Sequence, residues 1–210
     1  MPGVTISAGF GAGGSIIAPA LATRLGATYL DRALSAKVAQ QLNVTVEEAE
    51  GATVSLSLVD RVLKALAPLG DGAFGTVPPN AFPPEVEAER FRDQSEVIMR
   101  DALAGPGGAV ILGRAGAAAL RDEPGVLRVR LFGPPEARAR AAARIEGIDE
   151  RSAWDRLPDV DRDRAHYVKR LYSTDIDDPA LYHLQIDSTV IPHGACIDLI
   201  ATAYTALLAA

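Results

Sequence analysis

The feature of this sequence that most constrains its fold is a glycine-rich turn near the amino terminus, Gly9-Phe10-Gly11-Ala12-Gly13-Gly14. A short run of β-branched residues, 4–7, precedes the turn, and a helical pattern of apolar residues, 16–25, follows it. A glycine turn between a strand and a helix suits an anion, because the backbone approaches closely while free N–H groups and the helix dipole face the negative charge. The chain therefore opens with a candidate phosphate-binding turn.

The first interpretation of this turn is a dinucleotide-binding motif. The spacing Gly9-x-Gly11-x-x-Gly14 matches the dinucleotide fingerprint. Asp31 follows at a distance where an acidic side chain binds a ribose hydroxyl. This interpretation predicts an oxidoreductase that uses NAD(P).

The second interpretation is a P-loop, with the motif GxxxxGK[ST]. In this register Gly13 takes the last glycine, Ser15 the hydroxyl position, Gly14 the lysine position and Ala8 the first glycine. No lysine precedes Lys37, so backbone N–H groups and arginines must meet the phosphate charge. The turn alone favours neither interpretation, and a glycine turn that binds nothing is a third.

The remaining pattern alternates strands with helices. We expect Gly26 to end the first helix and the segment 45–48 to form a helical capping box. The glycines and prolines of residues 70–84 predict a long surface loop. Further strands are expected at 28–30, 109–112, 127–132 and 182–186, and further helices at about 84–103, within 134–172 and at about 194–208. Five strands alternating with helices predict an α/β fold with a parallel sheet covered on both faces.

Composition excludes several classes of protein. The chain is 48% hydrophobic and 23% charged and has one cysteine, Cys196, which argues against disorder, disulfide scaffolds and cysteine zinc sites. A net charge of −6 argues against nucleic-acid partners and anionic membranes. With no leader pattern and no long apolar run, we expect a cytoplasmic protein.

The basic residues are distributed unevenly. Only three of the 21 are lysines, Lys37, Lys64 and Lys169, and twelve of the arginines lie between Arg114 and Arg170. Because arginine binds phosphate through two parallel hydrogen bonds, this segment is a candidate phosphate-binding region.

Several motifs, in order along nearly the whole chain, resemble the cytidylate kinase-like family. The resemblance begins with Ile6-Ser7 and Gly11-Ala12-Gly13-Gly14-Ser15, followed by Leu25-Gly26-Ala27-Thr28-Tyr29-Leu30-Asp31-Arg32. It continues through Val110-Ile111-Leu112-Gly113-Arg114, Glu136-x-Arg138, Asp161-x-x-Arg164-x-x-Tyr167, Asp178-Pro179-x-x-Tyr182-x-Leu184 and Asp187-Ser188-Thr189.

The resemblance implies a three-layer fold of the P-loop NTPase type, with a five-stranded parallel sheet, helices on both faces and a helical lid. It implies one nucleoside monophosphate kinase-like domain over residues 1–210. Within it the core would be 1–65 and 105–210, a mobile acceptor-side insertion about 66–104 and the lid about 134–172.

The activity implied by the resemblance is phosphoryl transfer from ATP to CMP or dCMP under Mg²⁺, which makes small-molecule nucleotides the expected partners. By the same resemblance, the donor phosphates would be held by Gly11, Ala12, Gly13, Gly14 and Ser15. Such chemistry needs positioning and charge stabilisation rather than a protein nucleophile.

The resemblance also assigns the acceptor side and the catalytic arginines. Asp31 and Lys37 would lie in the acceptor site, and Arg114 would bind the acceptor phosphate. The expected lid or catalytic arginines are Arg138 and Arg164, with Asp161 either orienting Arg164 or contacting the acceptor nucleotide.

The chain departs from the pattern of cytidylate kinases at three positions. Gly14 replaces the P-loop lysine, Leu112 replaces an aspartate before the glycine-arginine pair, and Ala8 stands where related proteins place an arginine. These departures favour an alternative, a degenerate relative that binds a nucleotide or a phosphate compound without catalysis. The metal ligands stay unassigned.

Other polar residues are predicted to have structural roles. We expect Arg128 and Arg130 to be surface or sheet-end groups and Asp177 to belong to an acidic turn before Pro179. The histidines and the cysteine show no metal-ligand spacing and are expected to be structural or exposed: His166, His183, His193 and Cys196.

Overall fold

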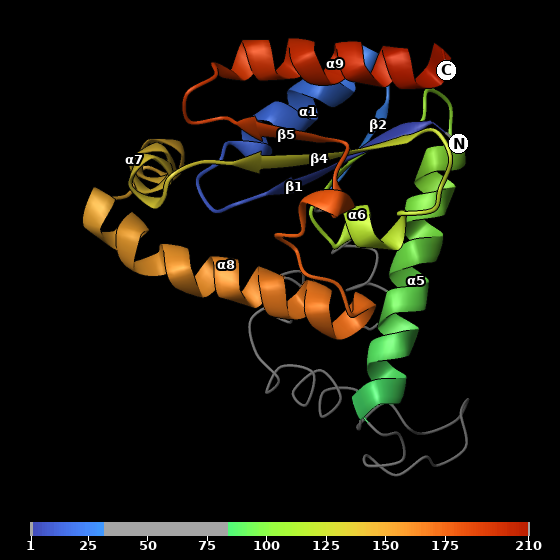
Figure 1. The fold of residues 1–210 in the computed structure, drawn as a ribbon, viewed down its shortest axis with the longest axis horizontal. Coiled ribbons are helices and arrows are strands. Elements are labelled where there is room, and N and C mark those ends of the chain that lie inside the picture. Colours follow the sequence, from blue (N-terminus) through green and yellow to red (C-terminus); the bar gives the residue numbers. More distant parts are fainter. Residues whose placement is uncertain (1, 32–83, 210) are drawn as a thin grey trace, which may run out of the picture. The chain divides into compact units, whose positions relative to one another are not determined.

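The computed structural model describes residues 2–31 and 84–209, and its centre is a β-sheet (Figure 1). The sheet has five strands in the order β2-β3-β1-β4-β5, and every neighbouring pair is parallel. The strands are β1 Gly3–Ala8, β2 Thr28–Leu30, β3 Ala109–Leu112, β4 Val126–Phe132 and β5 Leu184–Asp187. The predicted five-stranded parallel sheet is confirmed, with β1 at its centre.

Helices cover both faces of this sheet. Helices α1 and α9 lie on one face, and α6 and α8 lie on the other (Figure 1). The helices are α1 Gly14–Leu25, α5 Pro84–Ala104, α6 Gly116–Ala119, α7 Pro135–Glu146, α8 Glu150–Tyr172 and α9 His193–Ala209. In the described part of the chain, no helix combines the length and the apolar character that crossing a membrane requires.

The strand order bears on the two interpretations of the glycine turn. In the dinucleotide-binding fold the second strand neighbours the first. Here β3 lies between β2 and β1. The topology therefore does not support the dinucleotide alternative.

Two local details explain where elements begin and end. Gly26 ends α1 in the left-handed conformation, with φ 63°, as expected. The last strand begins at Leu184, two residues later than predicted, because Pro179–Leu181 form a short 3₁₀ helix. The Asp178 carboxylate caps that turn by accepting a hydrogen bond from the Ala180 N–H.

The contacts divide the chain into two compact units. The first comprises Met1–Asp31 and Glu96–Ala210 and contains the whole sheet; the second is Arg32–Ser95. The capping box expected at 45–48 and the loop expected at 70–84 lie outside the described residues. The single kinase-like domain with its insertion and lid stays a prediction.

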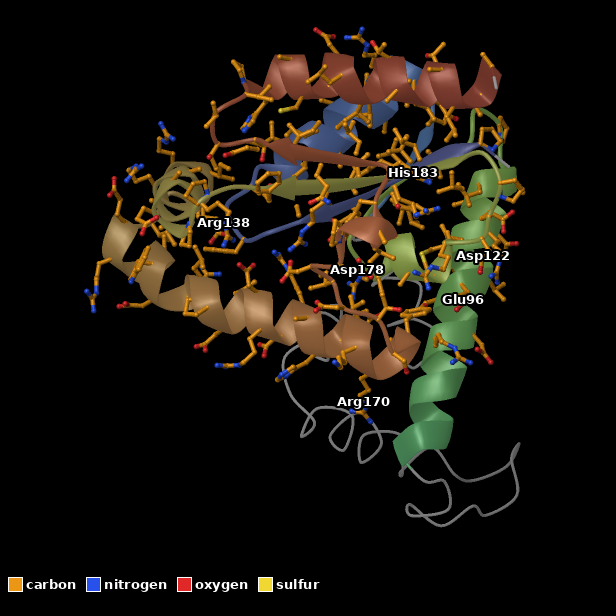
Figure 2. The ribbon with its side chains drawn as sticks, in the orientation of Figure 1. Glu96, Asp122, Arg138, Arg170, Asp178 and His183 are labelled. Carbon is orange, nitrogen blue, oxygen red and sulfur yellow. The ribbon has the colours of Figure 1, made fainter. Side chains whose placement is uncertain are left out.

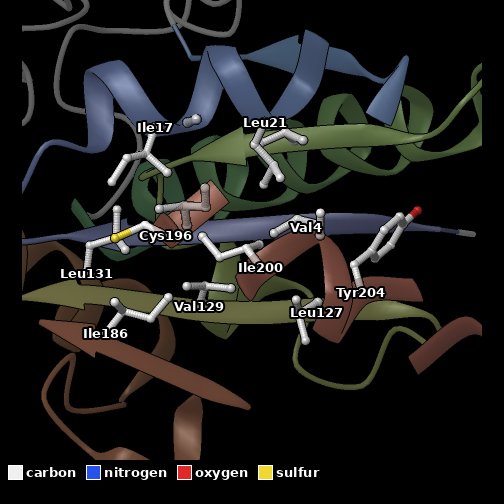
Figure 3. Close-up of a cluster of buried hydrophobic side chains, with 14 of the residues drawn as sticks. Val4, Ile17, Leu21, Leu127, Val129, Leu131, Ile186, Cys196, Ile200 and Tyr204 are labelled. Atoms are coloured by element: carbon white, nitrogen blue, oxygen red, sulfur yellow. The ribbon is translucent and has the colours of Figure 1, made fainter. Parts of the chain in front are cut away.

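The main hydrophobic core lies between the sheet and the α1–α9 layer (Figure 3). Its members come from strands and from both helices, among them Val4, Ile17, Val129, Cys196 and Ile200. The Cys196 thiol is fully buried, and burial raises its pKa. Cys196 is therefore a small core residue, the structural one of its two expected roles.

Candidate functional site

The glycine turn joins the carboxyl end of β1 to the amino end of α1. Gly11 and Gly13 adopt the left-handed conformation, with φ 75° and 72°. At Gly13, an added Cβ atom would lie 2.7 Å from the His193 Nε2 atom. At Gly11, it would collide with the Arg138 carbonyl oxygen. Both positions therefore require glycine.

The turn presents unpaired backbone donors. Within the described residues, no hydrogen bond is found for the N–H groups of Gly11, Gly13, Gly14 and Ser15. The Ala12 N–H, in contrast, donates to the Gly9 carbonyl at 3.0 Å. Four free N–H groups at a helix amino end form a site for phosphate oxygens.

Gly14, at the lysine position of the P-loop motif, is enclosed by apolar side chains. A Cβ atom there would lie 2.7 Å from the Ala8 Cβ atom and 3.0 Å from a methyl group of Leu112. Ala8 and Leu112 are the other two departures from the family pattern. The three departures therefore lie together in space.

Asp161 and Arg138 hold the peptide of Phe10 from both sides. Asp161 Oδ1 accepts a hydrogen bond of 2.8 Å from the Phe10 N–H, and Arg138 Nη1 donates to the Phe10 carbonyl at 3.0 Å. The two side chains are themselves joined, with 2.6 Å between Arg138 Nη1 and Asp161 Oδ2. We call these contacts the Phe10 clamp; Figure 2 shows Arg138 where α7 and α8 meet.

Apolar packing supports the Phe10 clamp. The Phe10 side chain is buried against α7 and α8 with Ala139, Ala142, Ala153 and Leu157. The Arg156 guanidinium lies 5.2 Å from the centre of the Phe10 ring. The two helices of the expected lid therefore pack directly on the glycine turn.

Arg164 approaches the same turn from the middle of α8. Its Nη1 atom donates to the Ala8 carbonyl at 3.0 Å and lies 3.9 Å from Asp161 Oδ1. Partial burial lowers the pKa of Arg164, and the neighbouring charge of Asp161 opposes this effect. Its side chain remains 46% exposed, which leaves it free to contact a ligand.

A cavity of about 220 Å³ opens between the turn, β4 and α8. Three arginines and two aspartates line it, together with the turn: Gly9, Arg130, Arg138, Asp161, Arg164 and Asp177. Of these residues, Arg138, Asp161 and Arg164 are expected site residues, whereas Arg130 is expected to be a surface or sheet-end group and Asp177 part of an acidic turn. The only sequence signal for Arg130 is its place on a strand whose carboxyl end lies at the ligand edge of the sheet.

Neither Asp31 nor Arg114, two of the expected acceptor residues, is among the residues that line this cavity. Arg114 follows β3 with φ 54° and lies close to Tyr167, whose pKa burial raises to about 12 against the opposing charge of Arg114. Asp31 accepts a hydrogen bond of 3.1 Å from the Tyr29 hydroxyl and acts electrostatically on Arg164. Lys37 lies outside the described residues.

The arrangement has the properties of a site for phosphate chemistry. It combines free N–H donors, guanidinium groups and a cavity at the carboxyl edge of a parallel sheet. The described residues contain no cluster of three or more side chains suited to bind a metal ion.

A sequence model of the cytidylate kinase-like family matches residues 3–190. The chain belongs to this family. A comparison with curated proteins found no match.

Solved structures show the same fold for this cytidylate kinase-like chain. An uncharacterized protein from Eubacterium ventriosum is 16% identical with a TM-score of 0.64, over 98% of this chain and 99% of that one. A gluconokinase from Sinorhizobium meliloti is 12% identical with a TM-score of 0.50, over 98% of this chain and 93% of that one. The predicted P-loop α/β fold is thus confirmed.

Proposed function

We propose that this protein transfers the terminal phosphoryl group of ATP to a nucleoside monophosphate, CMP or dCMP. The observation that carries the proposal is the convergence of Arg138 and Arg164 on a glycine turn with free N–H groups. Membership of the cytidylate kinase-like family supports it.

The donor phosphates of ATP fit the glycine turn. The free N–H groups of Gly11, Gly13, Gly14 and Ser15 offer hydrogen bonds, and the absence of side chains at the glycines lets phosphate oxygens approach. The Ser15 side chain is exposed at the start of α1, and its hydroxyl is a suitable ligand for Mg²⁺. When bound, Mg²⁺ supplies charge neutralisation to the phosphates.

The arginines would stabilise the charge that spreads over the transferred group. Among the described residues Arg164 donates one hydrogen bond, to the Ala8 carbonyl, so it has N–H donors left to contact phosphate directly. Arg138 uses Nε and Nη1 to hold Gly133 and the Phe10 clamp, and its Nη2 atom, which has no hydrogen bond to the described residues, can contact a ligand. Asp161 positions both arginines, and Arg114 would bind the acceptor phosphate.

The second candidate is a protein that binds a nucleotide or a phosphate compound without catalysis. The observation that favours it is the environment of Gly14. This residue stands in place of the P-loop lysine, and the nearest side chains are the apolar ones of Ala8 and Leu112. Loss of a charge partner of the transition state costs several kcal/mol, on the order of 3 kcal/mol for a single donor.

The test is ADP formation by the purified full chain with ATP, Mg²⁺ and a panel of nucleoside monophosphates. We expect turnover with CMP or dCMP that falls by about 100-fold or more in Arg114→Ala. Arg140→Ala, at an exposed position on α7, is the matched control and should keep the activity.

A thermal-shift panel with the same ligands separates the two candidates, since a ligand that binds the native state raises its unfolding midpoint. Stabilisation by ATP and CMP without ADP formation would contradict the kinase and support the binding protein. No stabilisation and no turnover would contradict both.

A further inference from the structure

The cavity beside the glycine turn contains a guanidinium that the proposed reaction does not use, that of Arg130 on β4. Its side chain is 13% exposed, which is unusual for an arginine. Burying a guanidinium is costly unless its charge and its N–H groups find partners. The partners of Arg130 therefore indicate what the site is built to hold.

The inner side of Arg130 is fixed by the protein. Arg130 Nη1 donates to the Ser7 hydroxyl at 2.8 Å, and the guanidinium lies 6.0 Å from the centre of the Tyr182 ring. Tyr182 is itself held, because its hydroxyl donates to the Ile176 carbonyl at 2.7 Å. Burial raises the pKa of Tyr182, against the opposing effects of Ser7 and Arg130. The guanidinium is thus placed before any ligand arrives.

The outer side of Arg130 has one ionic partner within the described residues. Arg130 Nη2 lies 2.7 Å from Asp177 Oδ1. Of five N–H donors in a guanidinium, the described contacts of Arg130 use two. Because the Arg130 side chain lines the cavity, its remaining N–H donors are available to a ligand there.

Asp177 differs from the other members of the cavity in its exposure. Its side chain is 72% exposed, on the segment between α8 and the 3₁₀ helix. An ion pair with so exposed a partner contributes little free energy. A ligand of higher charge would therefore displace this carboxylate at small cost.

The charges of the cavity favour a phosphate dianion. Arg130, Arg138 and Arg164 face Asp161 and Asp177. Asp161 is committed to the Phe10 clamp, so displacement of Asp177 leaves two positive charges in excess. The volume of about 220 Å³ is below the about 300–1,000 Å³ usual for whole small-molecule ligands and suits a phosphate group with part of its sugar.

We propose that Arg130 is a second direct ligand of the phosphate group of the acceptor, in addition to Arg114, and that Asp177 pairs with the Arg130 guanidinium until that phosphate displaces it. This inference rests on the proposed function. It assigns the cavity to a phosphate monoester and makes Asp177 a competitor of the substrate.

The test is isothermal titration calorimetry of the full chain with inorganic phosphate, CMP, cytidine and ATP. We expect phosphate and CMP to bind and cytidine not to bind, because the phosphate is the recognised group. Arg130→Met should lower the affinity for phosphate and for CMP about tenfold or more, and Arg130→Lys should lose less affinity than Arg130→Met. The matched control, Arg140→Met, should leave both affinities unchanged.

Asp177→Asn distinguishes displacement from simple binding. Removing the competing charge should raise the affinity for phosphate and for CMP about threefold to tenfold. If the carboxylate instead helps to bind the ligand, the affinity should fall. Asp159→Asn, at an exposed position on α8 outside the cavity, is the control for the loss of one negative charge.

Three results would overturn the inference. The first is that Arg130→Met and Arg140→Met have equal affinities for phosphate. The second is that Asp177→Asn binds phosphate more weakly than the wild type. The third is that Arg130→Met loses as much affinity for ATP as for CMP, which would assign Arg130 to the phosphates of the donor, ATP. Circular dichroism of each variant shows whether it is folded, and Arg130→Lys replaces Arg130→Met if the latter is not. Phosphate binding that depends on Arg130 without any ADP formation would contradict the kinase proposal and keep the assignment of the anion site.

Discussion

At the scale of single residues, the missing lysine of the P-loop is explained by its neighbours. The position of Gly14 has no room for a Cβ atom, because the Ala8 Cβ would lie 2.7 Å away. In the P-loop motif the position of Ala8 is a glycine and that of Gly14 is a lysine. In this chain the position of Ala8 carries a Cβ atom and that of Gly14 does not, which is the reverse of the motif.

We predict that Gly14→Lys alone destabilises the protein by about 1–3 kcal/mol, because the new Cβ meets Ala8 and Leu112. In the double variant Ala8→Gly/Gly14→Lys, part of this loss should be recovered. Urea unfolding of the four proteins of the cycle measures the coupling, which we expect to be about 1 kcal/mol or more.

The same double variant should bind ATP more tightly than the native chain, because it restores a positive charge beside the phosphates. Additive losses of stability in the cycle would show that the contact between the two positions is not the cause.

At the scale of elements, two helices are joined to the glycine turn through one aspartate. Asp161 on α8 contacts both the Phe10 N–H and Arg138 on α7. A single carboxylate therefore links α7, α8 and the segment between β1 and α1. Loss of this group leaves Arg138, 11% exposed, without its counter-charge.

We predict that Asp161→Ala lowers the free energy of unfolding by about 2–3 kcal/mol, as expected for charged hydrogen bonds that are partly buried. Asp159→Ala removes an exposed pair with Arg162 on the same helix and should cost less than about 0.5 kcal/mol. Urea unfolding compares the two variants, and equal losses would contradict a special role of the Phe10 clamp.

The amino end of α8 makes a prediction about pH. Asp149 caps this helix by accepting from the N–H and the hydroxyl of Ser152, at 2.9 and 2.6 Å. The Ser152 hydroxyl, and next its N–H, lower the pKa of Asp149 below its usual value. Because the folded-state pKa is depressed, the carboxylate stabilises the fold above the unfolded-state pKa, and the effect disappears as pH falls through the folded-state pKa.

Asp149→Ala should therefore lower the thermal midpoint at neutral pH and have little effect at a pH below the folded-state pKa of Asp149. Scanning calorimetry of the wild type and the variant at both pH values measures this. A difference in midpoint that does not change with pH would contradict the assignment.

At the scale of the whole molecule, the main hydrophobic core and the candidate site lie in different places. The core of the first unit lies between the sheet and the α1–α9 layer, whereas the candidate site lies at the carboxyl edge of the sheet against α7 and α8 (Figures 1 and 3). Substitutions in the core should consequently change the free energy of unfolding without altering ligand binding by the folded protein.

Ile200→Ala tests this separation, because Ile200 is fully buried in the core. We predict a loss of about 2–5 kcal/mol in urea unfolding, with phosphate affinity of the folded protein unchanged. Its neighbour Leu199, 47% exposed, is the control and should lose much less as Leu199→Ala. A change of affinity in Ile200→Ala would contradict the separation.

Much of the fold follows from patterns within short segments. Gly26 ends α1 because a left-handed residue is needed there, and glycine adopts this conformation without strain. The apolar strand Ala109–Leu112 has the predicted bounds, since a strand buried on both faces appears as a continuous apolar run. Tyr182 lies before the last strand because its N–H donates to the Pro179 carbonyl in the turn that Asp178 caps.

The site depends on contacts between distant segments. Asp161 and Phe10 are 151 positions apart in the chain, and no sequence pattern near either residue predicts their hydrogen bond. Arg128 and Arg130 are two residues apart on one strand, yet Arg128 donates to the Leu181 and Arg121 carbonyls while Arg130 lines the cavity. Local chemistry therefore determined that five strands alternate with helices, where α1 ends and where the glycine turn lies, because these depend on neighbours along the chain. Only the packing of β1, β4, α7 and α8 decided which charged side chains meet at the cavity, because their partners are neighbours in space.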